Sequence, residues 1–146
     1  FGRRRFADGG MHKGYRGDNA SWDAGPILYS DTTVEITPNR KAVSLLDAFT
    51  RKVRCEGVKI VYVKSPVYKP LLSKISNVAE SDSIIERIAK KYDVPILDYY
   101  YSDVSMDSTN FMTPGHLNKK GSEQFTVELC HDLDSMQIFK SFETIE

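Results

Sequence analysis

The fold of this chain is decided by Val58-Lys59-Ile60-Val61-Tyr62-Val63, which is followed by Lys64-Ser65-Pro66. The run is short and rich in β-branched residues, so it predicts a buried β-strand that is broken at Ser65-Pro66. A second strand is predicted over Pro95–Tyr99. Because a helical pattern separates the two runs, we expect them to lie side by side as parallel strands of one sheet.

Three helices are predicted around these strands. The first begins after Thr37, an N-cap residue type, and ends before Gly57, which suits a left-handed C-terminal position. The second follows the first strand, with Ser81 or Ser83 as its cap. The third runs from about residue 119 to residue 134, because Asn118 is a preferred N-cap and apolar residues follow it at helical spacing.

The order helix, strand, helix, strand, helix over residues 37–134 predicts an α/β fold, with a parallel sheet and helices on both faces. Residues 1–36 hold many glycines and no periodic pattern, so they are expected to be irregular, with a short strand around Thr33–Ile36 as an option. A chain of 146 residues is expected to form a single domain. Two strands are fewer than the about five or six of a typical sheet, so the domain is either incomplete or has its other strands within residues 1–36.

Composition argues against several classes of function. The chain has 20 basic and 20 acidic residues, so no net charge attracts nucleic acid or an anionic membrane. No apolar run reaches the roughly 18–20 residues that span a bilayer. Cys55 and Cys130 show no zinc-ligand or disulfide-framework spacing, and the histidines form no i, i+4 pair, so we expect no metal and no cofactor. The chain begins with Phe1, for which a processed precursor, an excised domain and a missing N-terminal segment are the open explanations.

His116 is the candidate catalytic base of this sequence. It lies in Phe111-Met112-Thr113-Pro114-Gly115-His116-Leu117-Asn118, directly before the third predicted helix, so its imidazole is expected at a rigid helix entrance. An imidazole so placed can take a proton from a hydroxyl nucleophile when an acid fixes its tautomer. The alternative is a loop histidine that hydrogen-bonds to backbone.

This block resembles the last sequence block of the SGNH/GDSL hydrolases, in which an Asp-x-x-His pair is followed by Leu-Asn and then by a Gly and an aromatic residue. His116, Leu117, Asn118, Gly121 and Phe125 match that pattern. The two predicted strands also resemble the late strands of the family, so the likeness covers roughly residues 40–134. It implies a flavodoxin-like, SGNH-hydrolase-like sheet and activity on acyl esters, such as O-acetyl groups of carbohydrate or lipid. It also favours a periplasmic or extracellular location.

The resemblance points to further site residues. Thr113 stands where the family has its Asp, and because threonine carries no charge, Asp103 or Asp107 would have to replace that acid. Ser65 and Asp98 follow or end the predicted strands, at the sheet edge where ligands bind in such folds, and are candidate substrate-binding residues. Ser65 also fits a plain turn, and Asp98 also fits a carboxylate that accepts from nearby backbone N–H groups.

The nucleophile block of the family, Gly-Asp-Ser after a core strand, has no clear counterpart. Gly17-Asp18-Asn19 has Asn in third place and follows no apolar strand, so we interpret this match as coincidence. The sequence therefore predicts one SGNH-like domain or its C-terminal portion, with a missing N-terminal segment or a homo-oligomer as open arrangements. The expected partner is a small-molecule or carbohydrate acyl ester. The alternative is a non-catalytic carbohydrate- or protein-binding or structural module, since the predicted loops hold many aromatic residues.

Overall fold

A computed structural model of the chain describes residues 17–20 and 22–138. In chain order its elements are α1 (Gly25–Tyr29), α2 (Arg40–Cys55), β1 (Tyr62–Lys64), α3 (Lys69–Leu72), α4 (Val78–Lys91), β2 (Ile96–Asp98), α5 (Asp103–Met106), the 3-10 helix η1 (Ser108–Asn110), β3 (Phe111–Thr113), β4 (His116–Leu117) and α6 (Lys119–Ser135). The described residues therefore form a mixed α/β structure.

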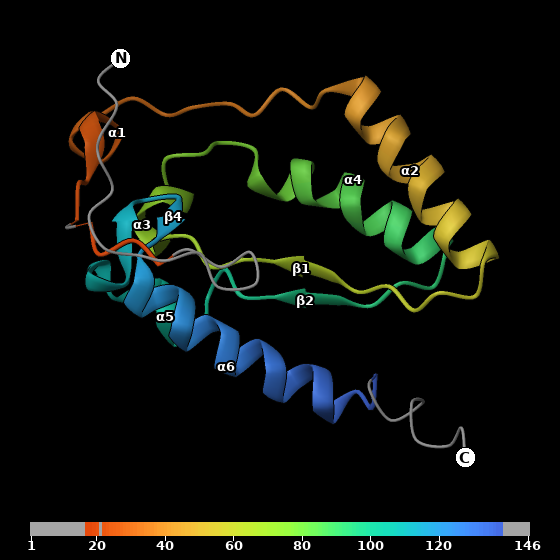
Figure 1. Cartoon of the computed structure of the whole chain (residues 1–146). Helices are drawn as coiled ribbons and strands as arrows, with labels where there is room; N and C mark the ends of the chain where they lie inside the picture. The colour runs from red at the N-terminus through yellow and green to blue at the C-terminus, as the bar shows by residue number, and fades with distance from the viewer. Residues whose placement is uncertain (1–16, 21, 139–146) are drawn as a thin grey trace.

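The parallel pairing of the two predicted strands is confirmed. β1 lies beside β2 with Tyr62 opposite Ile96 and Lys64 opposite Asp98. Both strands have only three residues, so the prediction that a strand begins at Val58 is wrong. The carboxyl ends of β1 and β2 point to the same side of the molecule, where α3 and the β3–β4 hairpin lie (Figure 1).

Helices cover both faces of this parallel pair (Figure 1). α2 and α4 lie on one face, where the hydroxyl groups of Thr50 in α2 and Tyr62 in β1 form a hydrogen bond. α6 lies on the other face, where the Phe125 ring packs edge to face on Tyr99, with 5.0 Å between the ring centroids. Tyr99 directly follows β2, so this contact holds α6 against the end of the sheet.

Two of the three predicted helix starts are wrong. α2 begins at Arg40, because the Asn39 side chain accepts a hydrogen bond from the Ala42 N–H at 3.1 Å, a role that was predicted for Thr37. α4 begins at Val78, ahead of the predicted serine caps. The start of α6 is confirmed, since the Asn118 side chain accepts from the Gly121 N–H at 3.0 Å.

The segment 101–115 holds short elements that the sequence does not predict. It contains α5, η1 and β3, and β3 pairs antiparallel with β4. Residues 17–36 are also less irregular than predicted, because they contain α1. The optional strand around Thr33–Ile36 is reduced to an isolated parallel bridge between Val34 and Ile75. Strands predicted as an option for residues 1–16 lie outside the described residues.

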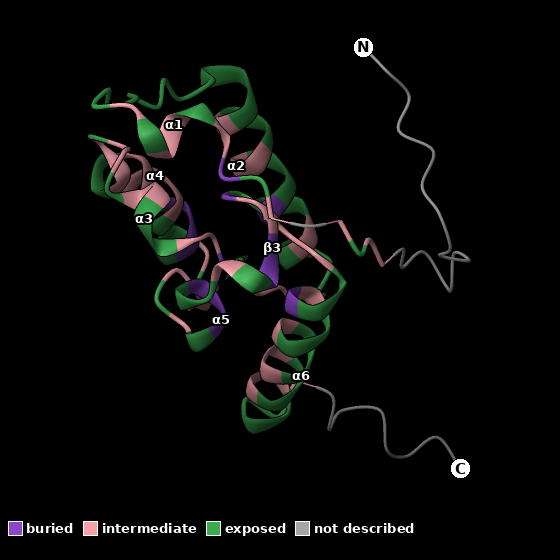
Figure 2. Cartoon of the chain, turned by 90° about the vertical axis from the view of Figure 1, so that its left-hand side faces the viewer, coloured by how far each residue is buried: buried purple, intermediate pink, exposed green. Residues whose placement is uncertain are grey.

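The buried residues gather partly where the hairpin, α5 and the start of α6 meet (Figure 2). Phe111 is completely buried there, and its ring packs against the rings of Trp22 and Tyr68. Two backbone bonds tie the segment that contains Trp22 to this region: Asp23 donates to the Met112 carbonyl at 2.9 Å, and Lys119 donates to the Asp18 carbonyl at 2.7 Å.

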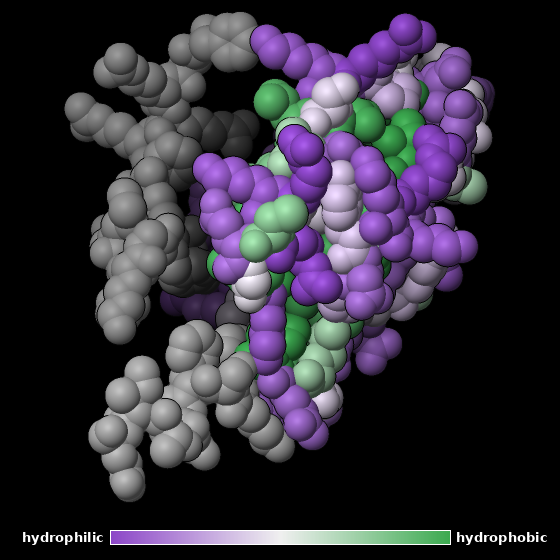
Figure 3. Space-filling view, turned by 90° about the vertical axis from the view of Figure 1, so that its right-hand side faces the viewer, coloured by the Kyte–Doolittle hydropathy of each residue, from purple (hydrophilic) through white to green (hydrophobic). Residues whose placement is uncertain are grey.

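The parallel pair is small for a sheet core. Within the described residues, no third strand joins β1 or β2. Large apolar side chains are correspondingly exposed, including Leu45, Phe49 and Val58, each of which is more than half accessible to solvent. Apolar surface is visible between polar side chains on one side of the molecule (Figure 3). No helix in the described ranges is long and apolar enough to cross a bilayer.

Candidate active site around His116

The β3–β4 hairpin holds His116 near the carboxyl ends of the parallel strands (Figure 1). Pro114 and Gly115 form the hairpin turn. The N–H of Tyr68 donates to the Pro114 carbonyl at 2.8 Å. Because Tyr68 ends the loop that follows β1, this bond ties the hairpin to the end of that strand. The hairpin thus brings the predicted base to the sheet edge where ligands bind in parallel α/β folds.

Thr113 is the hydrogen-bond partner of His116. The Thr113 hydroxyl oxygen lies 2.9 Å from Nδ1 of His116 across the hairpin. The residue at the family's Asp position therefore does contact the imidazole, through a hydroxyl in place of a carboxylate. A hydroxyl can either accept from an Nδ1–H or donate to a bare Nδ1, and only the first arrangement leaves Nε2 free to take a proton.

Asn118 keeps the His116 block in place. Its side-chain N–H groups donate to the carbonyls of Thr109 at 2.8 Å and Phe111 at 3.3 Å, while its side-chain oxygen caps α6. Its backbone N–H donates to the Asn110 carbonyl at 3.0 Å. One asparagine thus joins η1, β3 and α6, so its place in the sequence block is explained by structure alone.

Asp107 is engaged away from His116. Its carboxylate accepts from the Thr109 hydroxyl at 2.6 Å, from the Thr109 N–H at 2.8 Å and from Nζ of Lys120 at 3.2 Å. These hydrogen bonds lower the pKa of Asp107 to about 2. The Thr109 hydroxyl contributes most, followed by the Thr109 N–H and then Lys120. Asp103 lies in the first turn of α5. Neither carboxylate is hydrogen-bonded to His116 in the described structure, so their predicted role as a replacement acid stays a prediction.

Asp98 takes part in an ion cluster at the ends of β1 and β2. Nζ of Lys64 lies 3.0 Å from an oxygen of Asp98 and 3.0 Å from an oxygen of Asp82 on α4. The other Asp98 oxygen accepts from the Tyr100 N–H at 3.0 Å. Burial alone would lower the pKa of Lys64, but the hydrogen bonds to Asp82 and Asp98 outweigh it and raise that pKa above its usual value.

Lys64 lies at the same sheet edge, and it was not among the candidate residues predicted from the sequence. Its side chain is only 11% exposed, and a mostly buried ammonium requires the carboxylates that surround it. The available signal was a lysine at the end of an apolar strand. Ser65, the next residue, is exposed, and no hydrogen bond joins it to His116 in the part of the chain that the structure describes.

The described residues show no serine paired with the predicted base. No serine among residues 17–20 and 22–138 is hydrogen-bonded to His116. Asp18 accepts from the Lys119 N–H with its carbonyl and from the Ala20 N–H with its carboxylate, so the Gly17-Asp18-Asn19 segment lies against the start of α6. Across the described ranges, no group of three or more His, Cys, Asp and Glu side chains is placed to hold a metal ion.

Comparisons with protein-family models, with curated proteins and with solved structures give no match for this chain. The likeness to the SGNH/GDSL hydrolases is one of sequence pattern, and it enters below as a proposal.

Proposed function

We propose that this chain is part of an acyl-ester hydrolase of the SGNH/GDSL type, with His116 as its general base. The observation that supports the proposal best is the 2.9 Å contact between the Thr113 hydroxyl and Nδ1 of His116, in a hairpin tied to the end of β1. In the proposed enzyme the Thr113 oxygen accepts the Nδ1 proton. Nε2 is then the basic nitrogen, as a Ser-His mechanism requires.

The nucleophile of the proposed enzyme is a serine supplied by a further segment of a longer protein, because this sequence contains no Gly-Asp-Ser block. Its hydroxyl proton passes to Nε2 of His116 while its oxygen attacks the ester carbonyl, and the same proton then goes to the leaving alcohol. Water afterwards cleaves the acyl-enzyme by the same route. In this proposal the β1–β2 pair belongs to a larger, flavodoxin-like parallel sheet, which accounts for the exposed Leu45 and Phe49.

Thr113 makes this proposed enzyme a weak one. A hydroxyl orients the imidazole, but it supplies no negative charge to stabilise the imidazolium that forms in the transition state. Loss of the carboxylate costs about four orders of magnitude in turnover in serine proteases. Acetyl esters of carbohydrate or lipid are the proposed substrates, on the basis of the resemblance alone.

The second candidate function is a non-catalytic binding or structural module on the same scaffold. Two observations favour it: the acid position is Thr113, and no described serine is hydrogen-bonded to His116. Such a module would keep the hairpin for its packing, since Phe111 beside it is completely buried. Such a module would not need an Nε2 that is free to accept a proton.

Covalent labelling of the serine separates the two candidates. A longer protein that contains this chain would be treated with a fluorophosphonate, which reacts with serine activated by a base. The enzyme proposal predicts labelling that falls at least about tenfold in His116→Ala. His131→Ala is the matched control, because His131 is a strongly exposed imidazole on α6, and it should leave labelling unchanged. Absence of labelling, or equal labelling in all three proteins, would favour the binding module.

A further inference from the structure

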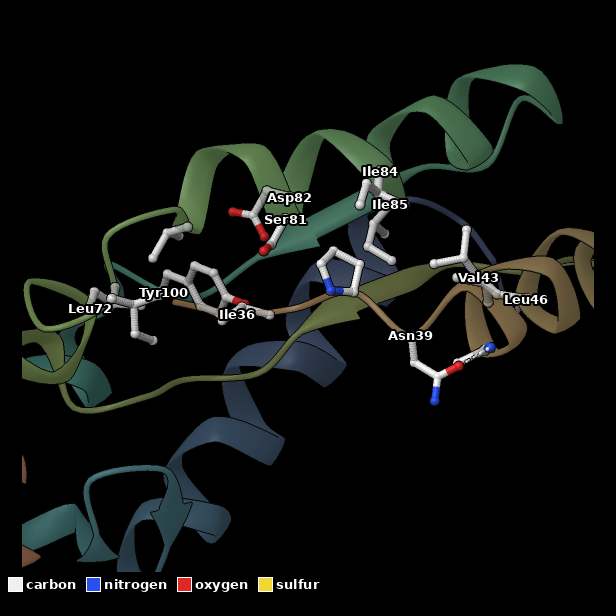
Figure 4. A pocket seen from close by; sticks show the side chains of 14 residues that line it. Ile36, Asn39, Val43, Leu46, Leu72, Ser81, Asp82, Ile84, Ile85 and Tyr100 are labelled. Atoms are coloured by element: carbon white, nitrogen blue, oxygen red, sulfur yellow. Dashed lines mark hydrogen bonds between the residues drawn. The ribbon is translucent and has the colours of Figure 1, made fainter. Parts of the chain in front are cut away.

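A cavity of about 350 Å³ lies between α2, α4 and the segment that leads into α2 (Figure 4). The residues around His116 do not line this cavity. Its wall is mostly aliphatic, and its main apolar side chains are those of Ile36, Val43, Leu46, Leu72, Ile84 and Ile85. Pockets of this size and character are typical of sites for small organic ligands, which bind by burying apolar surface around a few fixed polar groups.

The polar groups of this cavity come from one turn of α4 and from Tyr100. Ser81 and Asp82 project from α4 on the side where Tyr100 lies (Figure 4). The Ser81 hydroxyl oxygen is shielded from solvent and has no hydrogen-bond partner among the described residues. One oxygen of Asp82 binds Lys64, whereas the structure shows no hydrogen bond to the other. Beside the cavity there are thus an unpartnered hydroxyl, that of Ser81, and a carboxylate oxygen of Asp82, each able to make a further hydrogen bond.

An unpartnered buried hydroxyl is unfavourable by about 1–3 kcal/mol, so a ligand that bonds to it gains affinity and selectivity. The local charge decides what kind of ligand fits. Lys64 is already neutralised by Asp82 and Asp98, and Glu86 lies 3.8 Å from its ammonium, so the cavity offers no free cation to a carboxylate. Burial, and then the charge of Asp82, raise the pKa of Tyr100, so its phenol stays protonated at neutral pH.

We propose that this cavity binds an uncharged aliphatic alcohol, with its chain among the apolar side chains and its hydroxyl between Ser81 and Asp82. A hydroxyl group both donates and accepts, so it can donate to the free Asp82 oxygen and accept from Ser81. A carboxylate of the same chain length can accept from Ser81, but it is repelled by Asp82. The inference does not depend on any role of His116.

Titration of the chain with 1-octanol, followed by methyl NMR shifts, tests this inference. Saturable shifts are expected at Val43, Leu46 and Ile85. Sodium octanoate, which has the same number of carbons, should bind at least about tenfold more weakly, because its charge meets Asp82. Ser81→Ala should weaken octanol binding about fivefold. Ser83→Ala is the matched control, since the Ser83 hydroxyl already bonds to the Glu80 carbonyl and does not line the cavity.

A filling substitution provides the second arm. Ala42 lines the cavity from α2, so Ala42→Phe should abolish the octanol shifts, whereas Ala48→Phe, exposed on the same helix and outside the cavity, should preserve them. The inference is overturned if octanol and octanoate bind alike or if Ser81→Ala leaves the affinity unchanged. It is also overturned if shifts of equal size spread to exposed residues such as Leu45 and Val127, or if the cavity proves to be covered by a second copy in a stable dimer.

Discussion

The hydroxyl of Thr113 lies 2.9 Å from Nδ1 of His116, where the SGNH/GDSL pattern has a carboxylate. This contact is short enough to orient the imidazole, and it joins β3 and β4 next to the hairpin turn. Threonine at position 113 therefore still bonds to the histidine, although it lacks the negative charge of a carboxylate.

Replacement of Thr113 by aspartate should strengthen that partnership. In a longer protein that also carries the nucleophile, Thr113→Asp should raise kcat for an acetyl ester by about one to two orders of magnitude, with KM nearly unchanged. The reason is that a carboxylate stabilises the imidazolium, which exists only in the transition state. Steady-state kinetics measure both constants, and Thr126→Asp, on the exposed side of α6, is the control. An unchanged or lower kcat would mean that another carboxylate already fills the role, or that the site does not catalyse.

The chain by itself should be inactive. It should hydrolyse 4-nitrophenyl acetate no faster than its His116→Ala variant, because its sequence lacks the Gly-Asp-Ser block that carries the nucleophile of the proposed family. His131→Ala corrects for the background reaction of any exposed histidine with this ester. A clear loss of rate in His116→Ala alone would show that a working nucleophile is present in the chain and that the proposal of an external one is wrong.

The junction of η1 and α6 depends on the absence of a side chain at Gly121. A Cβ atom at this position would overlap the backbone carbonyl oxygen of Asn110 and would lie 2.9 Å from the Asn110 Cβ. Gly121→Ala should therefore lower the free energy of unfolding by about 2–3 kcal/mol, as overpacking does. At Gly115 the nearest atom is 4.0 Å away, so Gly115→Ala should change it by less than about 0.5 kcal/mol. Urea denaturation would measure both, and equal effects of the two substitutions would contradict the packing seen at η1.

Asp107 should make the hairpin region sensitive to acid. Its folded pKa of about 2 is below the ordinary value of 3.8, so its stabilising contribution is complete above that ordinary value and is lost as pH falls toward 2. Carboxyl NMR titration should place its midpoint near 2, and Thr109→Val should move the midpoint upward because the Thr109 hydroxyl is the largest cause of the shift. A midpoint that stays the same in Thr109→Val would refute this explanation.

Some elements of the fold can be predicted from the sequence, and others cannot. The parallel strands were predictable because their apolar runs are flanked by helical patterns, and the start of α6 was predictable because Asn118 is a strong cap. The start of α2 was not predictable, since Thr37 and Asn39 are both good caps. Only the hydrogen bond from the Ala42 N–H to the Asn39 side chain decides between them. Short elements such as η1 carry no periodic signal, and tertiary contacts fix them.

The candidate site was predictable in part for a similar reason. The sequence indicates His116 as the base, and it shows Thr113 as an uncharged residue at the acid position. Only the structure shows that the Thr113 hydroxyl bonds to Nδ1. The ion cluster around Lys64 joins residues from β1, β2 and α4. No local pattern links three segments so far apart in sequence, so that cluster could be found only in the folded chain.

The central claim is that Nε2 of His116 is the free, basic nitrogen, and the tautomer of the imidazole tests it most directly. Long-range ¹H–¹⁵N NMR of the ring, on the wild-type chain at a pH where the imidazole is neutral, distinguishes the protonated nitrogen from the bare one. We predict a proton on Nδ1, donated to the Thr113 hydroxyl, and a weaker preference for this form in Thr113→Val. A proton on Nε2, with Thr113 donating to a bare Nδ1, would contradict the account, because His116 could not then take a proton from a nucleophile.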